Sequence, residues 1–137
     1  MSKSSSGSAT APKGPLGRKA TVLVVDDEEL VRTVTQELLG CLGYDSAAAT
    51  SGEEAVELVR GGLRPDLVLL DVVMPGMGGI EAFRRLRELV PGIPVLISSG
   101  FTDSTAAAEL MDEGLNGIIT KPYRMENLSD RIKEVLG

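Results

Sequence analysis

The sequence contains no histidine, no tryptophan and a single cysteine, and aromatic residues make up 3% of its 137 residues. Without histidine there can be no Ser-His catalytic pair, no histidine-ligated zinc and no histidine phosphodonor. One cysteine excludes a disulfide within the chain and argues against a cysteine-based metal site, which favours a cytoplasmic protein. Any chemistry must therefore come from carboxylates, hydroxyls, lysines or backbone groups. We expect Cys41 to be a small buried apolar group.

Long apolar runs are also missing, since none reaches the roughly 18 residues of a membrane span. We therefore expect no membrane association. The net charge is −6, and residues 1–19 contain basic residues but no acid, so the remainder is strongly acidic. An acidic domain argues against direct nucleic-acid binding. Residues 1–19 are rich in Ser, Gly, Ala, Pro and Lys, and we interpret them as a flexible tail or linker before one domain at 20–137.

From residue 20 the chain alternates five times between a short apolar run and an amphipathic segment. The predicted strands are 21–25, 44–49, 67–70, 93–97 and 117–120. The predicted helices are 26–41, one capped by Ser51 and Glu54 and ending at Gly61, 79–90, one from 102 or 103 to about 113, and 125–136. Continuously apolar strands indicate a sheet covered on both faces. Right-handed crossovers then predict an α/β fold with a doubly wound, five-stranded parallel sheet.

Two of the predicted helices have a clear apolar stripe. The stripe of the 26–41 helix consists of Leu30, Val31, Val34, Leu38 and Leu39, and that of the 79–90 helix of Phe83, Leu86, Leu89 and Val90. We expect both stripes to face the core. The basic side chains of the 79–90 helix, Arg84, Arg85 and Arg87, are expected to form a solvated face.

Polar side chains end four of the predicted strands. They are Asp26 and Asp27, Asp71, Ser98 and Ser99, and Lys121. Because the carboxyl ends of parallel strands meet at one edge, these groups should converge. Three close carboxylates repel each other unless a cation joins them or one is protonated. A site that offers only oxygen ligands, with no histidine or cysteine, selects Mg²⁺, with Mn²⁺ as a substitute. A carboxylate nucleophile beside a metal, an ammonium and a hydroxyl suits phosphoryl transfer.

Each of these features has a simpler explanation when taken alone. An acidic pair can cap a helix, a lone aspartate can follow a strand in a turn, and a lysine before proline can lie on the surface. The complete set in this order weighs against those explanations.

Over residues 20–137 the chain resembles the receiver domains of two-component response regulators. The stretches that carry the resemblance are VLVVDDE (22–28), LVLLDVVMPGMGGIE (67–81), IPVLISSG (93–100) and TKPY (120–123). The resemblance implies a flavodoxin-like sheet of strand order 2-1-3-4-5 with five helices. It also implies a role for each site residue: Asp71 as the phosphoacceptor, Asp27 as a direct Mg²⁺ ligand, Asp26 as a ligand acting mainly through water, Val73 as a backbone-carbonyl ligand, Ser99 as the switch hydroxyl and Lys121 as the family's lysine. Ser98 is the alternative hydroxyl, and Ile118 stands where the family often has an aromatic residue.

The implied function is to accept a phosphoryl group from a histidine kinase or phosphotransfer protein and to change the surface that an unidentified downstream protein recognises. Such a chain is not an enzyme beyond catalysing its own phosphorylation and dephosphorylation, and it is a monomer or a weak phosphorylation-dependent dimer. Two alternatives stay open. A haloacid dehalogenase-type phosphatase would need an acid where Val73 stands, and a receiver-like module could go unphosphorylated. No DNA-binding segment follows the last predicted helix, so we expect a stand-alone regulator or the receiver of a larger protein such as a hybrid histidine kinase.

Overall fold

The computed structural model describes residues 19–71, 78–99, 104–121 and 123–136. In chain order, the elements within these ranges are β1 (Thr21–Val25), α1 (Glu29–Cys41), β2 (Asp45–Ala49), α2 (Gly52–Arg60), β3 (Leu67–Asp71), α3 (Gly79–Leu89), β4 (Val95–Ser99), α4 (Ser104–Asp112), β5 (Gly117–Thr120) and α5 (Met125–Leu136). The strands form one parallel sheet of order β2-β1-β3-β4-β5. The predicted fold class and strand order are confirmed.

Two predicted elements, the first helix and the fourth strand, are displaced most from those observed, and each has a local reason. The first helix begins at Glu29 instead of Asp26, because the Asp26 carboxylate accepts a hydrogen bond from the N–H of Glu28 at 3.0 Å and keeps this segment in a turn. The fourth strand runs from Val95 to Ser99 instead of from 93 to 97. Proline 94 has no N–H to donate to a neighbouring strand, so regular pairing begins after it.

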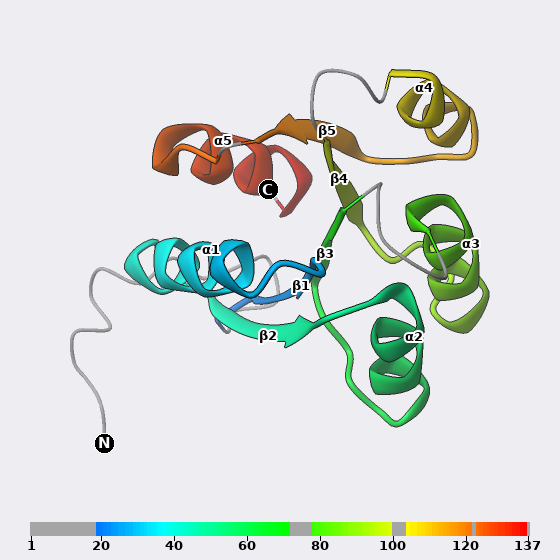
Figure 1. The fold of residues 1–137 in the computed structure, drawn as a ribbon, viewed down its shortest axis with the longest axis horizontal. Coiled ribbons are helices and arrows are strands. Elements are labelled where there is room, and N and C mark those ends of the chain that lie inside the picture. The colour runs from blue at the N-terminus through cyan, green and yellow to red at the C-terminus, as the bar shows by residue number, and fades with distance from the viewer. Residues whose placement is uncertain (1–18, 72–77, 100–103, 122, 137) are drawn as a thin grey trace.

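The sheet separates two apolar cores, with α1 and α5 on one face and α2, α3 and α4 on the other (Figure 1). Successive residues of a strand point to opposite faces. On β3, Val68 therefore packs in the core that contains Phe83 of α3. Its neighbour Leu69 packs in the core that contains Leu128 and Ile132 of α5. Both faces are buried, which explains why the first four residues of this strand are all apolar. Within the described residues, no helix has the length and apolar character needed to span a membrane.

The start of α2 follows the predicted capping pattern with one change. The Ser51 hydroxyl accepts a hydrogen bond from the N–H of Glu54 at 3.1 Å, as expected of an N-cap serine. The Glu54 carboxylate, however, accepts from the N–H and the hydroxyl of Thr50, at 2.6 and 2.9 Å. In a capping box it would accept from the N–H of the cap residue itself. Glu54 therefore also fixes the end of the β2–α2 connection.

Some side chains of the two predicted apolar stripes are exposed, so the prediction that both stripes face the core is partly wrong. Leu39 is fully buried, but Leu30 is 74% exposed and Val34 is 43% exposed. The two exposed side chains line a groove together with Lys121 and Tyr123, which leaves them open to solvent. Leu89, at the end of α3, is 36% exposed. Cys41 is exposed as well, contrary to prediction, because it lies on the outer side of the last turn of α1.

The basic residues of α3 are not simply a solvated face. Arg84 forms ion pairs with Glu109, at 2.8 Å, and with Glu113, so it links α3 to α4. The Arg87 guanidinium lies 4.7 Å from the ring centroid of Phe83. It also donates three hydrogen bonds, of 2.8 to 3.0 Å, to oxygens of Ile93, Gly114 and Asn116. These side chains tie α3 to the segments that flank β4 and β5, which the helical pattern could not reveal.

Candidate functional site

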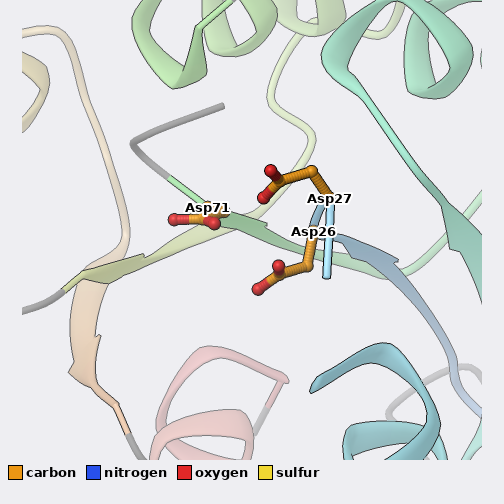
Figure 2. A group of neighbouring side chains, drawn as sticks. All are labelled: Asp26, Asp27 and Asp71. Atoms are coloured by element: carbon orange, nitrogen blue, oxygen red, sulfur yellow. The ribbon is translucent and has the colours of Figure 1, made fainter. Parts of the chain in front are cut away.

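Three aspartates meet at the carboxyl edge of the sheet, where β1 and β3 end side by side (Figure 2). Asp71 is the last residue of β3, and Asp26 and Asp27 directly follow β1. One carboxylate oxygen of each residue lies within 4.8 Å of the others. Asp26 and Asp71 are buried and Asp27 is exposed. The structure thus brings together the three carboxylates expected to meet at this edge.

Lys121 reaches the same point from the end of β5. Its Nζ lies 2.7 Å from Oδ2 of Asp26 and 3.1 Å from Oδ2 of Asp71. Burial by itself lowers the pKa of Lys121, but the hydrogen bond to Asp26 and the charges of Asp71 and Asp26 outweigh burial and raise the pKa above its ordinary value. The ammonium therefore stays charged at neutral pH, where it offsets part of the repulsion between the carboxylates.

The backbone and side chain of Asp26 are held on several sides. Its N–H donates to the Ala49 carbonyl at 3.2 Å, and its Oδ1 accepts from the N–H of Glu28 at 3.0 Å. Its own carbonyl accepts from Nη1 of Arg32 at 2.8 Å. In contrast, the Asp27 carboxylate has no hydrogen bond or ion pair with any described residue. Asp27 is therefore the carboxylate most available to bind a cation.

The three aspartates fit a hard divalent cation. Every donor is a carboxylate oxygen, and oxygen-only sites suit Mg²⁺. The charges of three carboxylates exceed that of one ammonium, so a divalent cation would neutralise the excess. The further ligand expected from the resemblance, the backbone carbonyl of Val73, lies outside the described residues.

The two candidate hydroxyls are placed differently. Ser98 is the register partner of Asp71 and is fully buried. Its Oγ has no hydrogen-bond partner of good geometry among the described residues. The Tyr123 hydroxyl lies near it: burial raises the pKa of Tyr123 to about 12, while Ser98 and Lys121 act in the opposite direction. The side chain of Ser99 lies outside the described part of the chain, so its role as the switch hydroxyl stays a prediction.

The sequence patterns did not single out Arg32. Its contact with the carbonyl of Asp26 spans six residues and depends on where α1 begins. One sequence signal could have identified Arg32: it is a basic residue in the first turn of the helix that follows the acidic end of β1.

An apolar groove adjoins the acidic cluster. It is lined by Leu30, Val31, Val34 and Thr35 of α1 and by Lys121 and Tyr123. Lys121 belongs to both features, since it also contacts Asp71. Exposed apolar side chains gathered in one place are typical of a surface that binds another macromolecule. A protein seated here would lie directly next to the three carboxylates.

Comparison with known proteins decides the family. The model of the response regulator receiver domain matches residues 22–133 of the chain. The chain belongs to this family. The match spans all five strands of the sheet except the first residue of β1, and it includes all three aspartates and Lys121.

Curated relatives include both regulators and kinases. The receiver is 40% identical over 116 residues to the response regulator GacA of Pseudomonas aeruginosa, covering 83% of this chain and 54% of that protein. It is 37% identical over 122 residues to the sensor kinase CckA of Brucella abortus, covering 88% of this chain and 13% of that protein. The receiver thus spans about half of GacA and a small part of CckA.

Solved structures agree with this assignment. A response regulator receiver domain protein from Clostridium thermocellum is 28% identical, with a TM-score of 0.81 over 85% of this chain and 94% of that one. The chemotaxis protein CheY4 of Vibrio cholerae is 30% identical, with a TM-score of 0.78 over 86% of this chain and 99% of that one. The whole fold is therefore that of a receiver domain.

Proposed function

We propose that this receiver accepts a phosphoryl group on Asp71 in the presence of Mg²⁺ held by Asp26, Asp27 and Asp71. One observation carries the proposal: three carboxylate oxygens lie within 4.8 Å of one another, with the Lys121 ammonium 3.1 Å from Asp71. Mg²⁺ would supply charge neutralisation for the phosphoryl oxygens. Asp71 supplies the nucleophile, and Lys121 supplies a second positive charge.

The reaction is a displacement at phosphorus. An Oδ atom of Asp71 forms a bond to the phosphorus, and the bond from phosphorus to the donor breaks. When the donor is phosphohistidine, the imidazole nitrogen leaves and takes a proton from solvent. Asp71 then carries an acyl phosphate, which adds roughly two negative charges at the sheet edge. Lys121 is placed to pair with those charges without moving far, because it already contacts Asp71.

Labelling with acetyl phosphate tests the proposal against the phosphatase alternative. We expect the chain, with Mg²⁺, to gain the mass of one phosphoryl group, and to gain none when the metal is chelated. A phosphatase would instead turn over a small phosphate ester such as p-nitrophenyl phosphate many times without lasting label. Multiple turnover of that ester would contradict our proposal, as would labelling that is unaffected by chelation.

We also infer that the apolar groove is where the phosphodonor protein docks. Leu30 and Val34 are exposed apolar residues, and the groove that they line is also lined by Lys121, which contacts Asp71. A donor protein must bring its phosphohistidine within bonding distance of Asp71, so it must cover a surface adjoining the cluster. The partner is therefore a histidine kinase or phosphotransfer protein, and such partners place the receiver in the cytoplasm.

Substitutions in the groove should distinguish docking of the donor protein from the phosphorylation of Asp71 itself. We expect Leu30→Ala combined with Val34→Ala to slow transfer from a phosphorylated histidine protein roughly tenfold or more, because truncated apolar anchors weaken protein contacts by that order. Labelling by acetyl phosphate should stay unchanged, because this small donor does not need the groove. Met111→Ala, which truncates a 48% exposed side chain on α4, is the matched control. Equal slowing with both donors would argue against a docking role.

A further inference from the structure

Arg32 makes a contact that the proposed function does not use. It lies in the first turn of α1, and its Nη1 donates to the backbone carbonyl of Asp26 at 2.8 Å. Its side chain therefore bends back from the helix onto the segment that carries Asp26 and Asp27. A surface arginine needs no such partner, so this contact raises the question of what it holds in place.

The contacted carbonyl belongs to the peptide group that joins Asp26 to Asp27. A peptide group is planar, so fixing its carbonyl also fixes the N–H and the Cα position of Asp27. The Asp27 carboxylate has no hydrogen bond or ion pair within the described part of the chain. The direction in which Asp27 points therefore depends on its backbone.

The other hydrogen bonds of Asp26 involve its N–H and its carboxylate, not its carbonyl. The bond from its N–H to Ala49 fixes the preceding peptide, and the bonds from Glu28 and Lys121 fix the carboxylate. The bond from Glu28 also spans the peptide that leads into Asp27, but none of these bonds contacts the carbonyl of that peptide. Among the described contacts, the hydrogen bond from Arg32 is the one that does.

We propose that Arg32 is a positioning residue for the cation site, which holds the peptide between Asp26 and Asp27 so that Asp27 faces Asp71. The inference rests on the proposed function, because it assumes that a divalent cation binds these carboxylates. The charge of Arg32 by itself would have the opposite effect. A guanidinium close to the site repels a divalent cation, so removing it would strengthen cation binding if charge were its only influence.

The affinity of the unphosphorylated chain for Mg²⁺, measured by calorimetric titration, therefore distinguishes the two effects by sign. Positioning predicts that Arg32→Ala binds Mg²⁺ roughly tenfold more weakly, the scale of loss typical when a group supporting a metal ligand is removed. Arg32→Lys can still donate a hydrogen bond to the carbonyl, so we expect it to recover most of the affinity. Arg85→Ala is the matched control, because it removes the same charge from α3, where the described partner of Arg85 is Glu81. Its affinity should equal that of the wild type.

The possible outcomes are distinct. If Arg32→Ala binds Mg²⁺ as tightly as the wild type, or more tightly, Arg32 does not position the site. If the wild-type chain binds no Mg²⁺ at millimolar concentration, the proposed function fails, and this inference fails with it. Circular dichroism would show whether each variant is folded. If Arg32→Ala does not fold, Arg32→Lys is compared with Arg32→Met, whose side chain has no hydrogen-bond donor. Weaker Mg²⁺ binding by Arg32→Met supports the proposal, and equal binding overturns it.

Discussion

Asp71→Asn is expected to abolish phosphorylation, whether the donor is acetyl phosphate or a phosphorylated histidine protein. An amide has nearly the shape of a carboxylate but is not a nucleophile at neutral pH, so no acyl phosphate can form. Intact mass after incubation with donor and Mg²⁺ measures the result directly. The wild type should gain one phosphoryl group and the variant none.

The same substitution should leave the fold intact or make it more stable. Asp71 is one of three carboxylates within 4.8 Å of one another, and removing its charge relieves repulsion with Asp26 and Asp27. Lys121 retains its partner Asp26 at 2.7 Å. Asp112→Asn, at an exposed acidic position on α4, is the matched control and should label like the wild type. Persistent labelling of Asp71→Asn would place the phosphoacceptor elsewhere.

Lys121→Met should have the second largest effect, with two separable consequences. The rate of labelling by acetyl phosphate should fall on the order of a hundredfold, because the transferring phosphoryl group loses a preorganised positive charge. The metal-free chain should also lose about 3 kcal/mol of unfolding free energy, the scale expected when one partner of a buried ion pair is removed. The side chains of Asp26 and Asp71 are 2% and 9% exposed, so water compensates little for the missing ammonium.

The pH dependence of that loss follows from the raised pKa of Lys121. A lysine whose folded pKa lies above its ordinary value of 10.5 contributes its full stabilisation below that pH, and the contribution is lost as the pH rises through the folded pKa. The difference between wild type and Lys121→Met should therefore be constant between about pH 7 and pH 9. Denaturant unfolding at both pH values measures it. Lys121→Arg, which keeps the charge, should recover much of the stability.

Mg²⁺ should restore more stability to Lys121→Met than to the wild type. In the wild type, Lys121 occupies Oδ2 of Asp26 and contacts Asp71, so a cation must compete with the ammonium for the same oxygens. Without the lysine this competition ends and the unpaired carboxylates gain the cation as their partner. Unfolding measured with and without Mg²⁺ would show this as a larger stabilisation of the variant. An equal gain in both proteins would mean that Lys121 and the metal do not share ligands.

The sequence by itself was enough for the architecture and for the position of the acidic cluster. Runs such as Thr21–Val25 and Gly117–Thr120 are short and rich in β-branched residues, as strands are, and the structure has strands with those bounds. Since every strand is parallel, residues that end strands must share one edge of the sheet. Local pattern and topology together therefore predicted that Asp26, Asp27 and Asp71 would meet.

Tertiary structure alone decided which surfaces are covered and which groups touch. Leu30 and Leu39 belong to the same apolar stripe of α1, yet one is exposed and the other buried, because only the second lies against the sheet. The partners of Arg84 are Glu109 on α4 and Glu113 directly after that helix, and they could not be read from the pattern of α3. A helical repeat specifies the direction of a side chain around its own axis, whereas the neighbour it meets depends on how distant segments pack.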